Sequence, residues 1–195
     1  MLLFLGVSGI GLLADLASKH YVFQSMLGQA DLRRQVQALL GRSRVAPAPT
    51  QLLHEEALRR YLQRQVLPGV RFTLSTNPGV VFGLDVPRPA VAIATLAALA
   101  LVAVLFATSD ARFRSIHLAL GFIMAGALGN LYDRLFVRIE LPGDGAIEHQ
   151  VRDFIDCSQL HYPWVFNVAD VLLVAGVAVL LVHWWLVRDG EGQAR

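Results

Sequence analysis

Four long stretches without a charged residue restrict what this chain can fold into. They cover residues 1–14, 89–109, 115–132 and 171–187. Most of them approach the roughly 17 to 25 residues that a helix needs to cross a bilayer, and the first does so if its helix continues past Asp15 and Lys19. The chain is also 55% hydrophobic, which exceeds the share of about 45 to 50% that is usual for globular proteins. The sequence therefore predicts an integral-membrane protein.

The fold class that follows is an all-α membrane protein forming a single integral-membrane domain over residues 1–195. We predict four transmembrane helices at about 2–23, 89–108, 115–135 and 167–187, with outer-face connections at about 24–88 and 136–166. The first helix lacks a basic segment before its apolar run, so we expect an uncleaved helix and not a cleaved signal peptide. The single cysteine, Cys157, rules out an intrachain disulfide bond.

The first long connection carries two segments with helical spacing, ADLRRQVQALLG and PTQLLHEEALRRYLQRQVLPG. In the second, leucines advance along one side while arginines and glutamates occupy the other, which predicts an amphipathic helix over 51–66 on the outer membrane face. The following VRFTLSTNPGVVFGL is rich in β-branched and aromatic residues. It predicts a small β hairpin, or cradle, that turns at Asn77.

Polar residues collect on one side of the predicted bundle. Because successive helices alternate in direction, the end of the first and third helices and the start of the second and fourth lie on one membrane face. The residues that this rule places there are Asp15, Lys19, Asn130, Asp133, Arg134, Asn167 and Asp170, with Asn77 and Asp153 in connections on the same side. The sequence predicts a polar pocket near one interface.

Spacing on the third predicted helix supports close packing around that pocket. Gly126, Asn130 and Arg134 lie on one stripe. Ala125 and Gly129 form a small-xxx-small pair, which lets helices approach closely.

Structural roles compete with functional ones for several of these residues. Asp15 and Lys19 are four residues apart, so they favour a neutralised structural pair, and Asp133 beside Arg134 favours an interface ion pair. Asn77 could serve the turn or a site. A carboxylate at bilayer depth costs several kcal/mol, roughly 2.5 to 3.5 even on lenient scales, so Asp153 and Asp170, with few bases nearby, favour a functional role.

Other classes of site find little support. Residues His149, Asp153, Cys157 and His161 recur every four positions, but Pro163 and the PGDG loop argue against a regular helix there, and no matching zinc motif occurs elsewhere. The arginines between 33 and 88 are not interleaved with aromatic residues as in a nucleic-acid interface. We therefore predict neither a metal site nor nucleic-acid binding.

Five motifs together resemble those of the lipoprotein signal peptidases, also called signal peptidase II. In chain order they are DLASK (15–19), TNPGVVFG (76–83), GALGNLYDR (126–134), VRDF (151–154) and FNVAD (166–170). The resemblance implies a four-helix aspartyl endopeptidase of the bacterial inner membrane, with its active site near the periplasmic face. Such an enzyme removes the signal peptide of a prolipoprotein just before the diacylglyceryl-modified cysteine.

The resemblance also implies roles for individual residues. Its catalytic aspartates fall on Asp153 and Asp170, and its substrate-binding residues fall on Asn77, Asn130, Arg134 and Asn167. Asp15, Lys19 and Asp133 would support the site. The expected partners are diacylglyceryl-modified prolipoproteins, membrane lipid and globomycin-type inhibitors, and no cofactor is required.

This chain departs from the family pattern at a few positions. VRDF carries Arg152 where a valine is usual, and the connections 24–70 and 135–150 are longer than in typical members. None of the departures removes a side chain that the chemistry needs. A proton-coupled small membrane transporter is the main alternative function, since intramembrane carboxylates also relay protons, and a non-catalytic lipid-binding or scaffold protein is a third.

Overall fold

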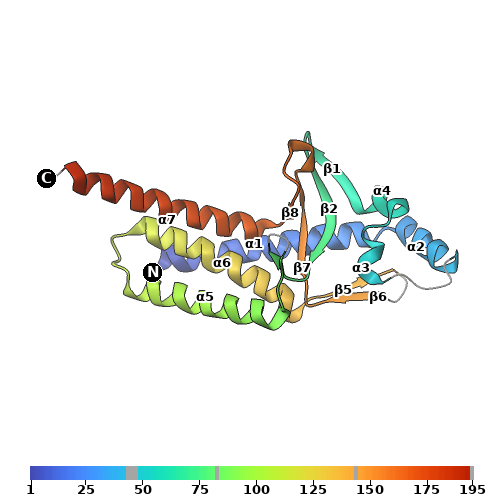
Figure 1. Cartoon of the computed structure of the whole chain (residues 1–195), viewed down its shortest axis with the longest axis horizontal. Coiled ribbons are helices and arrows are strands. Elements are labelled where there is room, and N and C mark those ends of the chain that lie inside the picture. The colour runs from blue at the N-terminus through green and yellow to red at the C-terminus, as the bar shows by residue number, and fades with distance from the viewer. Residues whose placement is uncertain (43–47, 82–83, 143–144, 194–195) are drawn as a thin grey trace. The chain divides into compact units, whose positions relative to one another are not determined.

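The computed structural model describes residues 1–42, 48–81, 84–142 and 145–193, and it divides the chain into two compact units. The helical unit comprises residues 1–16, 89–131 and 168–195, and the mixed unit comprises residues 17–88 and 132–167. Both units include part of α1 (Leu2–Leu27) and part of α6 (Arg114–Phe136). Each is described by itself below, and the elements are labelled in Figure 1.

Four helices of the described chain are long and apolar enough to cross a membrane: α1, α5 (Arg88–Thr108), α6 and the Val168–Val187 part of α7 (Val168–Gln193). Their bounds lie within a few residues of the predicted ones. Pro89 falls in the first turn of α5, where proline's missing N–H costs nothing because that donor has no helical partner. The predicted four-helix membrane fold is confirmed.

Helix α6 is the central packing element of the helical unit. Half of its apolar window is buried, against 11% for α5 and 6% for α7. Many leucines and valines of α5 and α7 remain exposed, as is appropriate for side chains that meet lipid. A small core forms where Phe4 and Phe106 stack at 3.9 Å beside Val102 and Leu120.

Small residues bring the helices of this unit into close contact, as the spacing on α6 predicted. A side-chain Cβ added to Gly11 of α1 would lie 2.8 Å from the Cβ of Ala125, tighter than real contacts allow. On the other side of α6, a Cβ added to Gly126 would overlap the backbone of α7 at Ala169. The backbones can approach only because these positions lack larger side chains.

The mixed unit is built around a four-stranded antiparallel sheet in the order β1-β2-β7-β8 (Figure 1). Its strands are β1 (Gln63–Leu67), β2 (Val70–Asn77), β7 (Val151–Asp156) and β8 (Val165–Phe166). Two short hairpins accompany it: β3 (Val80–Val81) with β4 (Leu84–Asp85), and β5 (Arg138–Leu141) with β6 (Gly145–Glu148). A turn at Gly69, which has φ +83°, joins β1 to β2.

The predicted pairing of β2 was wrong in part. We expected a hairpin between residues before and after Asn77, but β2 pairs with β1 and with β7, and the short β3 pairs with β4 instead. The turn itself is confirmed, because the side chain of Asn77 accepts a hydrogen bond from the N–H of Gly79 at 2.9 Å. Phe82 and Gly83 of this motif and Gly143 and Asp144 of PGDG lie outside the described residues.

The segment 51–66 is not the single amphipathic helix that its pattern predicted. It forms α3 (Pro49–Leu52), a 3-10 turn η1 (Glu56–Leu58), α4 (Arg59–Leu62) and then β1. Glu55 interrupts the helix with an extended ψ of 121°. Tertiary pairing decided the outcome, because the end of the segment hydrogen-bonds to β2 as a strand.

The leucines of this segment find their apolar partner inside the protein. Leu52, Leu58 and Leu62 are buried together with Leu32 and Val36 of the amphipathic helix α2 (Ala30–Arg42). These side chains surround a void of only about 10 Å³, which is near the smallest volume that holds one water molecule. The leucine stripe is thus part of a packed core, and the amphipathic helix of the first long connection is α2.

Candidate active site

Asp170 stands in the first turn of α7, where a carboxylate is favoured by the positive end of the helix dipole. Its Oδ1 accepts a hydrogen bond from Nδ2 of Asn130 at 2.9 Å. Asn130 lies one turn after Gly126 on α6, where an added Cβ would lie 2.4 Å from the carbonyl oxygen of Ala169 on α7. The small residue at 126 therefore lets the amide at 130 reach the carboxylate.

Asp15 supports the same helix start from α1. Its Oδ1 accepts a hydrogen bond from the backbone N–H of Ala169 at 2.8 Å, and its side chain is fully buried. The first N–H groups of a helix have no partner within the helix, so this carboxylate satisfies one of them. Gly129 of α6 leaves room for it, because an added Cβ would overlap the carboxylate. Within the helical unit, Asp15 thus supports the start of α7.

Asp153 lies on β7 in the mixed unit and is 5% exposed. Its Oδ1 accepts a hydrogen bond from Nδ2 of the fully buried Asn167 at 2.6 Å. Across the sheet its strand partner is Ser75. Between Phe72 and Ser75 the register shifts, so β2 carries an extra residue there, and such bulges are common beside active sites.

A buried cluster of charges anchors the start of β7. Asp133 is fully buried and accepts hydrogen bonds from the backbone N–H of Arg152 at 2.9 Å and from its Nη2 at 2.7 Å. Lys19, also fully buried, places its Nζ 3.4 Å from Asp133 Oδ2. Buried charges need such partners, because an isolated one costs several kcal/mol. The ion pair predicted for Asp133 was expected with the adjacent Arg134, and the structure forms it with Arg152 and Lys19.

Arg152 is the site residue that sequence reasoning missed. It attracted notice only as a departure from the pattern around Asp153, and its side chain is 9% exposed. Its partner Asp133 is 19 positions away in the chain. A charged residue within the apolar-aromatic strand VRDFI was the available signal, since a buried arginine requires a carboxylate nearby.

The remaining predicted residues lie in the mixed unit. Asn77 ends β2, where its side chain serves the turn, and Arg134 lies near the end of α6, where its carbonyl oxygen accepts a hydrogen bond from His149 Nδ1 at 3.0 Å. Within each unit the structure pairs one predicted substrate-binding amide with one predicted catalytic carboxylate, Asn130 with Asp170 and Asn167 with Asp153. Because Asp153 and Asp170 belong to different units, their association as one dyad stays a prediction, as does the pairing of Asp15 with Lys19.

The chemistry available at these positions is that of carboxylates held by amides. A carboxylate oxygen can exchange a proton with water or a carbonyl group, and amide and guanidinium groups can donate hydrogen bonds to a peptide carbonyl. Among the residues that the structure describes, histidine, cysteine and carboxylate side chains do not gather in threes as metal ligands do.

Comparison with known proteins identifies the family. The chain matches the family described as signal peptidase (SPase) II over residues 7–186. It is 33% identical over 161 residues to a lipoprotein signal peptidase of Geobacter metallireducens, covering 78% of this chain and 90% of the relative. It is also 33% identical over 130 residues to a lipoprotein signal peptidase of Aquifex aeolicus, covering 64% of this chain and 71% of that protein.

The fold agrees with this relationship. A solved structure described as a bacterial membrane enzyme superposes with a TM-score of 0.63 at 19% identity, covering 97% of this chain and 90% of that chain. At such low identity the likeness speaks for the fold alone. The family match over almost the whole chain establishes the rest: this multi-pass membrane protein belongs to the signal peptidase II family of proteases.

Proposed function

We propose that this protein is an aspartic endopeptidase that removes the signal peptide of prolipoproteins on the amino-terminal side of a diacylglyceryl-modified cysteine. The observation that carries the proposal is a matched pair of contacts. Asn167 donates to Asp153 at 2.6 Å and Asn130 donates to Asp170 at 2.9 Å. All four residues belong to the motifs by which the chain resembles lipoprotein signal peptidases, and its relatives carry that name.

Asp153 and Asp170 are proposed as the catalytic dyad. Asn167, which donates a hydrogen bond to Asp153, precedes Asp170 by three residues in the chain, so one short stretch of chain carries both the amide that holds Asp153 and the second carboxylate. Two carboxylates in a shared, partly desolvated pocket do not ionise together easily. One retains a proton while the other is ionised, which is the division of labour that an aspartic protease needs.

The proposed reaction uses these two protonation states in turn. The ionised carboxylate takes a proton from a water molecule, whose oxygen attacks the carbonyl carbon of the scissile peptide bond, while the protonated carboxylic acid donates a hydrogen bond to the carbonyl oxygen. A proton then passes from the dyad to the leaving nitrogen and the C–N bond breaks. The products are a signal peptide with a new carboxylate and a lipoprotein with a new amino terminus on its lipidated cysteine.

Neighbouring polar groups supply binding and electrostatic stabilisation in this proposal. Asn130 and Asn167 orient the carboxylates, and Asn77 and Arg134 hold the substrate backbone and the developing oxyanion. The Asp133 cluster fixes the start of β7, one residue from Asp153. Membrane lipid surrounds the helices, and a globomycin-type inhibitor would compete for the same pocket.

The proposed location is the bacterial inner membrane with the active site near the periplasmic face. A prolipoprotein spans that membrane through its apolar signal peptide, so its cleavage site lies near the interface. Membership of a protease family favours this function over the proton-coupled transporter.

Cleavage of a purified, diacylglyceryl-modified prolipoprotein tests the proposal directly. Asp153→Asn and Asp170→Asn should each lower kcat by roughly 10²- to 10⁴-fold while the protein stays folded, because the amide keeps the shape but cannot exchange a proton. Asp31→Asn is the matched control, since Asp31 is exposed and pairs only with Arg34 among the contacts described. The dependence of rate on pH should be bell-shaped, with both limbs belonging to the pair jointly.

Two results would contradict the aspartic mechanism. One is near-normal cleavage by either folded Asn variant. The other is loss of activity in a chelator followed by recovery on addition of zinc. Absence of cleavage by the unmodified protein, with proton-coupled uptake in vesicles, would instead support the transporter.

A further inference from the structure

A cavity of about 390 Å³ lies on the sheet of the mixed unit, and none of the residues assigned above lines it. One wall consists of residues 53–56 and Arg59. This wall belongs to the long first connection of the chain. The floor comes from β2 and β7 and from the 3-10 turn η2 (Ser158–Leu160). We call it the sheet groove, and its volume lies within the range of ligand pockets, roughly 300 to 1,000 Å³.

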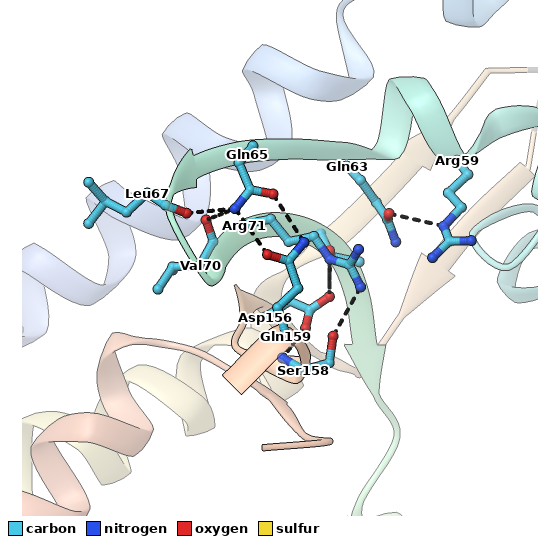
Figure 2. A network of polar contacts seen from close by, with 10 residues as sticks. Arg59, Gln63, Gln65, Leu67, Val70, Arg71, Asp156, Ser158 and Gln159 are labelled. Atoms are coloured by element: carbon cyan, nitrogen blue, oxygen red, sulfur yellow. Dashed lines mark hydrogen bonds and ion pairs between the residues drawn. The ribbon is translucent and has the colours of Figure 1, made fainter. Parts of the chain in front are cut away.

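The floor of the sheet groove carries a compact ion pair that is already satisfied. Arg71 Nε lies 2.6 Å from Asp156 Oδ2, and Arg71 Nη2 donates to Ser158 Oγ at 3.0 Å (Figure 2). Thr73 Oγ1 donates to the same carboxylate at 3.1 Å, and the N–H of Ser158 donates to it at 2.8 Å. The side chains of Arg71 and Asp156 are 19% and 6% exposed, so they form a fixed floor without net charge.

The rim of the sheet groove is polar as well. Arg59 Nη1 lies 3.3 Å from Glu56 Oε1, and its Nε donates to the side chain of Gln63 at 3.1 Å (Figure 2). A second arginine is therefore matched by a carboxylate. A bound charged side chain would have to compete with these existing pairs, whereas an uncharged polar group can add hydrogen bonds without breaking them.

The sheet groove begins at Ser75, opposite Asp153, which is one of the two proposed catalytic residues. Ser75 lines it and is the strand partner of Asp153, whereas Asp156 lies three residues farther along β7. Three strand residues span about 10 Å. An extended peptide that reaches Asp153 at one end would lay about three residues along the sheet groove.

The chemistry of the two substrate halves decides which one fits. In the function proposed above, the signal-peptide half is apolar and lies in the bilayer, whereas the residues after the lipidated cysteine are in water. The sheet groove presents charged and polar side chains beside apolar ones, and it consists only of residues outside the four apolar spans. We propose that the sheet groove binds the first three or so residues of the mature lipoprotein, in extended form, and that it favours uncharged polar residues.

Reciprocal charge changes in the floor provide the test, which rests on the proposed protease function. Three lipidated prolipoprotein peptides share one signal segment and carry three serines, three aspartates or three lysines after the modified cysteine. The unmodified enzyme should give its lowest KM with serines. Asp156→Asn exposes the positive charge of Arg71, so the KM for aspartates should fall about tenfold relative to that for lysines, and Arg71→Gln should reverse the ratio.

The controls separate binding from structural damage. Arg34→Gln removes one partner of an exposed pair elsewhere and should leave the KM ratio unchanged, and general damage to the fold would affect all three peptides alike. If one floor variant does not fold, the KM ratio of the other variant and the serine preference of the unmodified enzyme still test the inference. Equal KM values for the three peptides, or unchanged ratios in the folded floor variants, would overturn the inference. Failure of the unmodified enzyme to cleave any of them would refute the proposed function itself.

Discussion

Replacing Asp133 by asparagine should destabilise the protein strongly, although the two side chains have nearly the same shape. The asparagine can still accept the hydrogen bond from the N–H of Arg152, but it removes the negative charge that faces the guanidinium of Arg152 and the ammonium group of Lys19. All three side chains are at most 9% exposed. Breaking a buried ion pair by removing one partner typically costs about 3 to 5 kcal/mol. We expect about 3 kcal/mol, because Lys19 makes further contacts.

Thermal unfolding in detergent measures this cost. A loss of about 3 kcal/mol corresponds to a fall in Tm on the order of 10 °C for a chain of this size. Asp31→Asn is again the control, since the Asp31 and Arg34 side chains are 64% and 77% exposed and exposed pairs contribute about 0 to 1 kcal/mol. Well below Tm, the Asp133 variant should retain far more cleavage activity than Asp153→Asn.

The refuting result is specific. If Tm of Asp133→Asn lies within about 2 °C of the Asp31→Asn control, the buried cluster does not stabilise the fold as argued. If the folded variant instead loses as much activity as Asp153→Asn at an unchanged Tm, Asp133 acts in the chemistry and not in the framework.

Three further predictions concern packing, acid stability and orientation. Gly126→Ala should lower kcat and cost about 1 to 3 kcal/mol of stability, because its Cβ would overlap the backbone of α7. Gly9→Ala is the control and should do neither, because its Cβ meets no atom within 4 Å. Equal Tm and kcat for the two variants would exclude the close packing. Burial raises the pKa of Asp156, but hydrogen bonds from the backbone of its neighbour two residues on and from an arginine outweigh that effect and lower the pKa from 3.8 to about 2. Its contribution of about 2 kcal/mol to the free energy of unfolding is therefore complete above pH 4 or so and is lost as the pH falls through 2. The difference in unfolding free energy between the unmodified protein and Asp156→Asn should shrink by roughly that amount between pH 5 and pH 2, and their Tm values should converge. A constant difference in Tm would contradict the pKa shift. Single cysteines in a cysteine-free background of intact cells should accept an impermeant label at Gly41 and not at Ser109, and the opposite pattern would reverse the proposed orientation.

The sequence alone predicted the transmembrane helices well, for a physical reason. A bilayer imposes both a length and an absence of charge on any spanning helix, so the four apolar stretches indicate their own boundaries to within a few residues. Close packing along α6 was also predictable, because small residues four positions apart on a helix share one face. The contacts of Gly126 and Ala125 confirm it.

The motifs predicted the two candidate catalytic carboxylates and two amides near them, but not which amide would hold which carboxylate. Asn130 and Asn167 were expected to bind substrate, and the structure pairs Asn130 with Asp170 and Asn167 with Asp153. What no motif states is the geometry that joins them, such as the bulge that sets Ser75 opposite Asp153.

The mixed unit is where sequence patterns failed, and the failures share a cause. The helix expected over 51–66 and the hairpin expected around Asn77 rest on local signals, but β1 and β2 take their final form from pairing with each other and with β7. The partner of Arg71 is Asp156, which lies 85 positions along the chain. Local patterns cannot encode such a distant partner.

What the sequence by itself determined is therefore the membrane-spanning architecture, because hydropathy and helical periodicity act over a few turns, and the identity of the polar motif residues proposed for the site. The tertiary structure alone decided how those residues are paired. Arg152 became a buried partner of Asp133, and the leucines of the first connection became a protein core, because strands and buried charges are stabilised by groups far away in the chain.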